Sequence, residues 1–186
     1  MITPFMRKAF LFLVVLFLSQ QLFSQNSENK WTFGVSLASA KYITKLQARK
    51  VGGQFVYQTP RLNLSKYMFS GLTLDGGVST AIGDTQKYTT LDGTIRYDFG
   101  TSDNNVVPYV LLGGSILIAN RPTPTLNFGA GNTFWFSQRY GLNIQFMYKY
   151  SEERFESQFS HYYTSVGLVY SFGLRSLVPR IWNENH

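Results

Sequence analysis

Apolar and polar residues alternate with a period of two along most of this chain. The clearest stretch is YGLNIQFMYKY, in which Leu142, Ile144 and Phe146 share one face while Asn143 and Gln145 share the other. Successive side chains of a β-strand point to opposite sides, so this alternation predicts a strand with one apolar face. Amphipathic helical patterns are scarce, and we therefore predict an all-β protein.

Eight runs of this kind follow one another along the chain. They cover residues 30–41, 51–67, 71–81, 87–99, 106–118, 125–136, 140–150 and 161–172. Pro60 lies inside the second run and predicts a bulge or bend there, because proline cannot donate a ladder hydrogen bond. The connections after the first, third, fifth and seventh runs are mostly longer or more polar than the others. This rhythm predicts a series of antiparallel hairpins with two unlike ends.

The first residues have the layout of a secretory signal peptide. Arg7 and Lys8 precede an apolar run at residues 9–18, and a polar segment follows, with Ser24 as the expected last residue of the signal. Ten apolar residues are too few for a membrane-spanning helix, which needs about 20. We therefore assign residues 1–24 to a cleavable signal peptide and expect an exported protein.

Composition narrows the partners that such a protein could meet. The chain has 186 residues and no cysteine, so disulfides cannot hold the exported fold together. Without Arg7 and Lys8, 17 − 2 = 15 basic residues stand against 10 acidic ones, a net charge of +5. This favours anionic lipid headgroups or surface glycolipid over nucleic acid as partners. Zinc-ligand spacings, phosphate loops and nucleophile elbows are missing from the sequence, so we expect neither a metal site nor a cofactor.

Eight antiparallel strands with one apolar face suit two opposite arrangements. A soluble ligand-binding barrel turns its apolar face inward, whereas a membrane barrel turns it outward to lipid. The interior of an eight-stranded barrel has room only for its own side chains. The polar face is rich in small residues, and the other face carries bulky ones. Aromatic residues near the ends with short turns also predict an interfacial girdle at Trp31, Tyr67, Tyr97, Tyr109, Trp135, Tyr140 and Tyr170. We therefore favour the membrane barrel.

The last run, SVGLVYSF, carries a short motif at Ser165, Gly167, Tyr170 and Phe172. It resembles the C-terminal assembly signal of bacterial outer-membrane barrels. The chain as a whole resembles the OmpA-like family of small outer-membrane β-barrels, also in the phrases PYVLLGG and FGAGNTFWFSQRYGLNIQFMYKY. This resemblance implies an eight-stranded antiparallel up-and-down transmembrane β-barrel, with both termini periplasmic and four external loops.

The resemblance also implies a cellular location and a set of partners. The barrel is expected over residues 25–173, followed by a short periplasmic tail at 174–186 in place of the peptidoglycan-binding domain that many relatives carry. The expected location is the bacterial outer membrane. The expected partners are outer-membrane lipid, surface glycolipid and the barrel insertion machinery, and the protein is expected to be a monomer that binds no nucleic acid.

Charged residues on the polar face are expected to point into the lumen and to neutralise one another, because an unpaired buried charge is costly. They are Asp75, Asp92, Arg96, Asp98 and Lys149. A basic cluster surrounds the first external loop and is a candidate for contact with anionic glycolipid, the alternative being a solvated run of charge. It consists of Lys41, Lys45, Arg49 and Lys50.

These residues favour a non-enzymatic outer-membrane barrel with a structural or surface-binding role. One alternative is a lipid A-modifying hydrolase, because His161 lies near Ser157, Ser160 and Glu156 at the expected outer rim. Neighbours along a strand alternate faces, however, so proximity in sequence does not assemble a catalytic triad. A second alternative, a small pore or a component of a secretion assembly, stays open.

Overall fold

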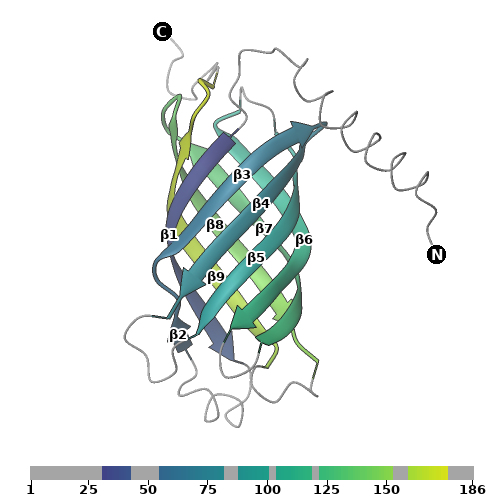
Figure 1. The fold of residues 1–186 in the computed structure, drawn as a ribbon. Coiled ribbons are helices and arrows are strands. Elements are labelled where there is room, and N and C mark those ends of the chain that lie inside the picture. Colours follow the sequence, from purple (N-terminus) through teal and green to yellow (C-terminus); the bar gives the residue numbers. More distant parts are fainter. Residues whose placement is uncertain are drawn as a thin grey trace, which may run out of the picture.

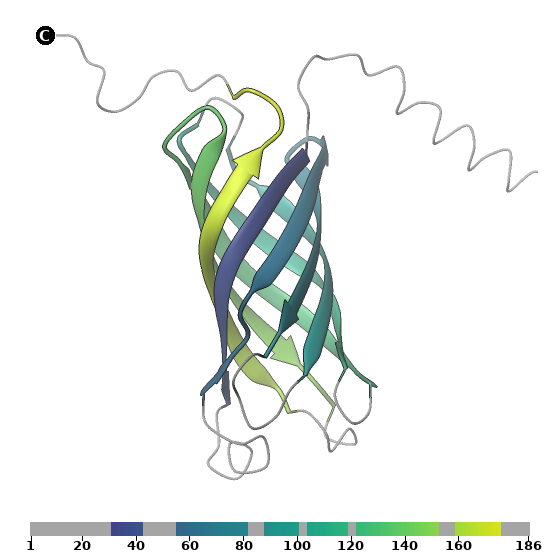
Figure 2. The same ribbon diagram turned by 60° about the vertical axis from the view of Figure 1, so that its left-hand side comes forward.

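The protein folds into one continuous antiparallel sheet that closes on itself (Figures 1 and 2). A computed structural model describes residues 31–42, 55–81, 88–100, 104–118, 122–152 and 159–175. The strands of these residues are β1 (Trp31–Tyr42), β2 (Phe55–Tyr57), β3 (Arg61–Phe69), β4 (Leu72–Thr80), β5 (Thr89–Asp98), β6 (Val106–Ile118), β7 (Pro122–Trp135), β8 (Tyr140–Tyr150) and β9 (His161–Ser171). The predicted signal peptide lies outside the described residues.

Strands β2 and β3 are two parts of a single barrel strand. Both pair with β1, on the edge of β1 that faces away from β9. Between Tyr57 and Arg61 the chain advances four residues, while its partner advances three, from Ser39 to Ser36. The predicted irregularity at Pro60 is therefore a bulge with one extra residue. Counting β2 and β3 together, the described strands make an eight-stranded barrel.

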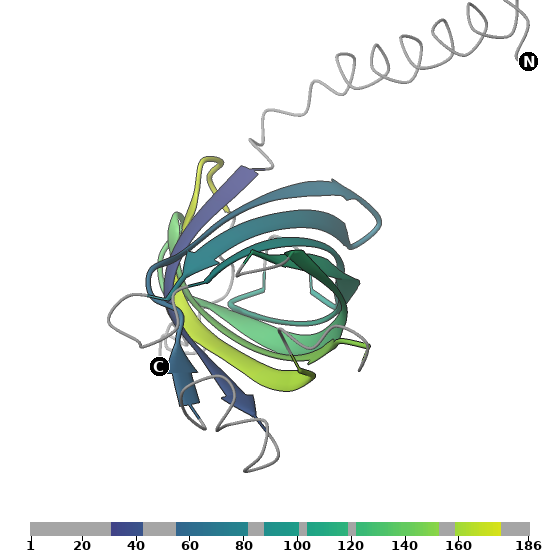
Figure 3. The same ribbon diagram turned by 60° about the horizontal axis from the view of Figure 1, so that its bottom comes forward.

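The barrel closes between the first and last strands. β1 and β9 are paired over their length, from Thr32 opposite Ser171 to Tyr42 opposite His161, and the end view in Figure 3 shows the resulting ring. Closure leaves no open sheet edge in lipid, where unsatisfied backbone groups would cost several kcal/mol each. The predicted fold class, an all-β, eight-stranded, antiparallel up-and-down barrel, is confirmed.

The two ends of the barrel carry different connections. At the end where β1 begins and β9 ends, Ser70 and Gly71 form a two-residue turn with positive φ angles of 47° and 81°, as tight hairpins require. At the other end β1, β4, β6 and β8 end, and most residues of the connections that follow them, 43–54, 81–88, 119–121 and 151–160, lie outside the described residues. The expected rhythm of long and short connections is wrong at 119–121, because β7 begins at Pro122, three residues earlier than predicted. β8 pairs with β7 from Leu126 onward, so Pro122 and Pro124 lie where β7 has an unpaired edge, which is where strands tolerate proline.

Large apolar side chains cover the outside of the barrel on every strand. Near the middle of the strands most are aliphatic, such as Leu37 (68% exposed) and Leu112 (59% exposed), with Phe128 and Phe146 among them. Exposed aromatic residues lie toward both ends, among them Trp31, Phe69, Tyr97, Phe99, Tyr140 and Phe172 at the end with the termini, and Phe55, Tyr57, Tyr150 and Tyr162 at the other. This is the distribution of a barrel that crosses a bilayer, with an aliphatic band between two aromatic girdles.

Three predicted members of the girdle do not belong to it. Tyr109 and Trp135 are buried inside the barrel, and Tyr67 lines its interior at the end with the termini. Bulky lumen residues fit in a narrow barrel because glycines lie opposite them: Tyr109 pairs with Gly131, and Trp135 pairs with Gly141. The prediction placed these residues by distance from a strand end and did not assign their faces. Among the described residues, no helix is long and apolar enough to cross a membrane.

Gly167 in β9 allows β1 to approach closely at the seam. A Cβ atom there would overlap Ser36 Cβ and the carbonyl oxygen of Val35. We expect Gly167→Val to destabilise the closed barrel by about 1–3 kcal/mol, the usual cost of overpacking. Gly93→Val is the matched control, since a Cβ atom added at Gly93 would meet nothing within 4 Å. Urea titration of the refolded protein in lipid vesicles measures both, and equal midpoints would contradict close packing at the seam.

Candidate functional site: the barrel lumen

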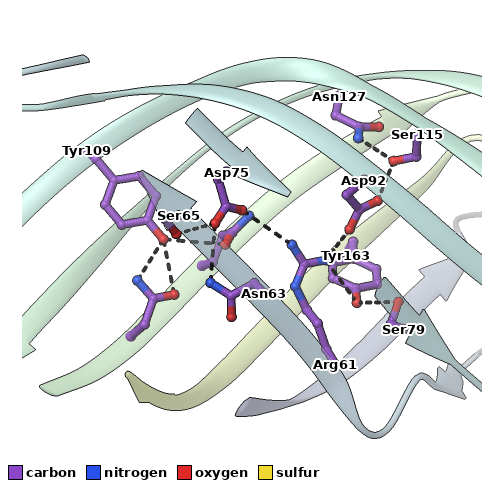
Figure 4. Close-up of polar contacts among 12 residues, drawn as sticks. Arg61, Asn63, Ser65, Asp75, Ser79, Asp92, Tyr109, Ser115, Asn127 and Tyr163 are labelled. Carbon is purple, nitrogen blue, oxygen red and sulfur yellow. Dashed lines mark hydrogen bonds and ion pairs between the residues drawn. The ribbon is translucent and has the colours of Figure 1, made fainter. Parts of the chain in front are cut away.

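A network of buried charges fills the middle of the lumen (Figure 4). The carboxylate of Asp92 on β5 forms ion pairs with Arg61 on β3 and with Lys149 on β8, the latter with 2.6 Å between Nζ and Oδ1. Ser115 also donates a hydrogen bond to Asp92, with 2.5 Å between the oxygens. Arg61 lies 3.9 Å from the carboxylate of Asp75. These contacts connect strands from opposite sides of the barrel.

Polar side chains surround this network and hydrogen-bond most of its remaining groups, although Arg61 Nη2 has no hydrogen-bond partner among the described residues. Asp75 accepts hydrogen bonds from Ser65 and from Asn63, the latter at 3.2 Å. The hydroxyl of Tyr163 lies 3.4 Å from the Arg61 guanidinium and donates to Ser79 at 3.2 Å. Its ring also lies under both cations, with centroid distances of 5.3 Å to Arg61 and 4.3 Å to Lys149. The network is thus neutral overall, with two carboxylates and two cations, and rigidly positioned.

A second ion pair lies closer to the end with the termini. Arg96 Nε is 2.8 Å from Asp98 Oδ1, and the hydroxyl of Thr73 donates to Asp98 Oδ2 at 2.6 Å. The Arg96 guanidinium also covers the ring of Tyr109, with 4.5 Å to the centroid. Together with the central network, the described strands therefore turn three cations and three carboxylates into the lumen.

Arg61 is the lumen residue that sequence reasoning missed. It is 1% exposed, and it contacts both Asp75 and Asp92. Strict alternation from Val56, which faces inward, would place Arg61 outward. The extra residue at the Pro60 bulge reverses that parity. The signal was present in the sequence, because Pro60 predicted a register shift, but its size was not predictable.

The half of the lumen beyond this network is filled by apolar and aromatic side chains. The buried cluster includes Tyr42, Leu117, Met147 and Tyr163. His161 is 1% exposed, with its ring 4.9 Å from that of Tyr42 and Nδ1 2.8 Å from the carbonyl oxygen of Phe159. The side chain of His161 therefore points into this cluster and away from the solvent.

The end with the termini contains a cavity of about 560 Å³. Its lining includes Tyr67, Arg96, Asp98, Trp135 and Arg175. The segment after β9 runs across this end: the backbone N–H of Arg175 donates to the Gln138 carbonyl at 3.1 Å, and its guanidinium lies 4.3 Å from the Trp135 ring centroid. The lumen is therefore packed in its middle and in the half away from the termini, and it is hollow at the end with the termini.

The remaining predicted site residues lie at the seam and at the loop end. In the assembly motif, Ser165 points into the lumen, while Phe172 faces outward. Tyr170 contacts the rings of Tyr140 and Phe172, with centroid distances of 5.3 Å in both cases, and accepts a hydrogen bond from Arg139. Lys41 is exposed, with Nζ 5.5 Å from the centroid of Phe55. The other three basic residues of its predicted cluster, Lys45, Arg49 and Lys50, lie outside the described residues.

The packed lumen predicts that the purified monomer conducts little or no steady current in planar bilayers. Charged pairs and apolar side chains would have to separate before a continuous water column could form. The control is Lys149→Ala combined with Met147→Ala, which removes two buried side chains and should raise the frequency of brief openings. Large stable channels from the wild-type protein would contradict this packing.

Comparison with known proteins agrees with this architecture. No known family model matches the chain, and no curated protein matches its sequence. Solved structures that share the fold include the N-terminal β-barrel domain of Pseudomonas aeruginosa OprF (TM-score 0.57, 15% identity, covering 78% of this chain and 98% of that one). Two others are the P. aeruginosa outer membrane protein OprG (TM-score 0.55, 11% identity, 80% and 99%) and Neisserial surface protein A (TM-score 0.51, 15% identity, 77% and 97%). The expected resemblance to small outer-membrane barrels is thus confirmed at the level of the fold.

Proposed function

We propose that this chain, which has the fold of the small outer-membrane barrels, is an integral outer-membrane protein with a structural or surface-binding role and no catalytic activity. The observation that carries the proposal is the inverted distribution of side chains. Each barrel strand exposes large apolar residues outward, and every strand except the largely apolar β6 turns mainly polar, charged or small residues inward. In water such a surface would drive aggregation, whereas a bilayer solvates it.

Two features of the lumen support a role without catalysis. The hydroxyl of Ser160 donates to the backbone carbonyl of Ser151 at 3.0 Å, and it accepts the N–H of that residue at 2.9 Å. The Nδ1 atom of His161 contacts the Phe159 carbonyl, and its ring is buried. Of the candidate hydrolase residues, Ser160 therefore bonds to backbone groups and His161 is turned into the buried lumen, while Glu156 and Ser157 lie outside the described residues. The packed lumen likewise favours a plugged barrel over a pore.

The surface-binding role is proposed for the loop end of the barrel. Lys41 lies there on the outside of β1, and the sequence continues with Lys45, Arg49 and Lys50. Lysine ammonium groups at an interface attract anionic headgroups by about 1 kcal/mol each. The proposed ligand is anionic surface glycolipid, which occupies the outer leaflet beside this end. Removal of the Lys41 charge should therefore weaken binding to this glycolipid. Removal of the Lys66 charge is the matched control, because Lys66 lies on the outside of β3 at the opposite end of the barrel.

The proposed outer-membrane location can be tested in cells with variants of the last strand, β9. Tyr170 and Phe172 form part of the aromatic girdle next to Tyr140. The double variant Tyr170→Ala with Phe172→Ala should be exported normally but should reach the outer-membrane fraction in a several-fold lower folded amount. Heat-modifiable migration on gels of membrane fractions measures this. Leu168→Ala with Val166→Ala, on the same face of β9, is the control and should assemble well. A wild-type protein that fractionates with the soluble periplasm would overturn the proposal.

A further inference from the structure

A groove crosses the outer wall of the barrel between β3 and β7. Its volume is about 690 Å³, within the roughly 300–1,000 Å³ typical of ligand pockets. Three glycines that face outward on neighbouring strands form its floor, with Gly76 opposite Gly93 and Gly93 opposite Gly114. Leu64 on β3 and Leu126 on β7 continue the same row and bound it at its two ends. With about 4.8 Å between neighbouring strands, the three glycines span about 10 Å.

The walls and the direction of the groove suit a hydrocarbon chain. One wall is the outward row Leu74, Ile95 and Leu112, and the other is the outward row Val78, Leu91 and Ile116. Figure 1 shows β3, β4, β5 and β6 side by side and tilted. A row that crosses these strands from β3 to β6 therefore also leads from the end with the termini toward the other end. An acyl chain that lies along it would contact aliphatic side chains on both sides and glycine backbone beneath.

Lys66 lies where the groove begins, at the side nearer the termini. It belongs to the lining, and its Nζ atom lies 5.1 Å from the centroid of the Trp31 ring. The carboxylates of the described strands, Asp75, Asp92 and Asp98, all point into the lumen, and Lys66 takes part in no ion pair among the described residues. The groove thus has a cation without a counter-charge from these strands, beside a tryptophan of the interfacial girdle.

We propose that this groove binds one anionic phospholipid from the leaflet next to the termini. The headgroup phosphate pairs with Lys66 beside Trp31, and one acyl chain crosses β4, β5 and β6 over the three glycines. The charge of Lys66 favours this lipid over a second copy of the chain, which would bring another Lys66 and no outward carboxylate from the described strands. That the leaflet is the periplasmic one rests on the proposed outer-membrane location. Binding itself depends only on the folded barrel in a bilayer.

The experiment measures which lipid lies against Trp31. The full mature chain with Trp135→Phe and Trp182→Phe keeps Trp31 as its one tryptophan. It is refolded in vesicles of phosphatidylcholine and phosphatidylglycerol, in which one lipid or the other carries bromine atoms that quench tryptophan fluorescence on contact. Phosphatidylglycerol should be enriched at Trp31 about fivefold, the effect of roughly one lysine at a membrane surface. Lys66→Gln should remove this enrichment. Lys41→Gln removes the same charge at the opposite end of the barrel and should leave it unchanged.

The contribution of the groove is tested with Gly93→Leu. The new side chain fills the floor without a clash, because a Cβ atom at Gly93 would meet nothing within 4 Å. It should displace the acyl chain and so reduce the enrichment of phosphatidylglycerol at Trp31, although Lys66 keeps its charge. Ala130→Leu is the matched control, because it adds the same side chain to the outer face of β7 outside the groove lining, and it should leave the enrichment unchanged.

Heat-modifiable migration of each variant shows that the barrel is folded before the fluorescence is measured. Three results would overturn the site: equal quenching of Trp31 by the two lipids, equal effects of Lys66→Gln and Lys41→Gln, or an unchanged enrichment in Gly93→Leu. A chemically cross-linked dimer that is lost in Gly93→Leu would assign the groove to a second copy and would also overturn it. A folded barrel without lipid preference leaves the proposed location intact. A chain that does not enter the outer membrane in cells but still enriches phosphatidylglycerol in vesicles would refute that location alone.

Discussion

Replacement of Asp92 with asparagine is expected to cost about 3–5 kcal/mol of the free energy of unfolding. Asp92 is the carboxylate shared by Arg61 and Lys149, and the side chains of all three are at most 1% exposed. The variant keeps the shape of the side chain but leaves two buried cations close together without their common counter-charge. Urea titration of the refolded barrel in vesicles measures the loss.

Two controls distinguish lost charge pairing from general damage to the lumen. Asp98→Asn is the same substitution at a carboxylate that borders the cavity, where water can replace part of the lost interaction, and it should cost clearly less. The triple variant Arg61→Met, Asp92→Leu and Lys149→Met removes the whole network with side chains of similar volume, and should regain most of the stability lost in Asp92→Asn. An unfolding free energy of Asp92→Asn within about 1 kcal/mol of wild type would show that the three charges are not coupled.

Replacement of Ile144 with arginine is expected to cost about 2–4 kcal/mol of the same free energy. Ile144 lies near the middle of β8 and is 40% exposed on the outer face. There the added guanidinium would have to leave water for hydrocarbon. Ile144→Leu keeps the face apolar and should change stability by less than about 1 kcal/mol.

The inward neighbours of Ile144 provide the opposite comparison. Asn143→Ala looks harmless from the sequence, but Asn143 donates hydrogen bonds to Tyr109 and Thr133 at 2.9 Å each. We therefore expect it to cost about 1–3 kcal/mol, the penalty of leaving buried polar groups unpaired. Gln145→Leu is the cleaner inward substitution and should be tolerated. A tolerant Ile144 beside an intolerant Gln145 would mean that the faces are inverted.

Strand order and sidedness could be predicted because side-chain alternation is local and nearly unbroken in several strands. In β8 the prediction separates Ile144 from Asn143 without any knowledge of neighbouring strands, and β1 behaves in the same way. The motif at the end of β9 then identified the closing strand. The assignment of faces depends on alternation within one strand, which can be followed directly in the sequence, whereas the closing strand was inferred from the resemblance of its motif.

The predictions failed where the alternation of inward and outward side chains is interrupted, or where both faces of a strand are apolar. The bulge at Pro60 reverses the faces of β3, so Arg61 joins the lumen although simple counting places it outside. β6 is apolar on both faces, and nothing in VVPYVLLGGSILI shows that Tyr109 points inward. The inward orientation of Tyr109 depends on the space left by Gly131 on the neighbouring strand. This pairing is known only once the strands are arranged in the barrel. The cavity near Trp135 likewise depends on residues from most of the strands and on the segment after β9.

Site-directed spin labelling tests most directly whether the barrel carries its apolar face toward lipid. The chain has no cysteine, so single cysteines at Ile144, Gln145, Phe146 and Met147 can each be labelled alone in vesicles. Accessibility to oxygen, which concentrates in hydrocarbon, should be high at Ile144 and Phe146 and low at Gln145 and Met147, with little accessibility to a water-soluble nickel chelate at any of them. Low oxygen accessibility at Ile144 and Phe146, with the nickel chelate reaching them instead, would contradict a membrane-spanning barrel.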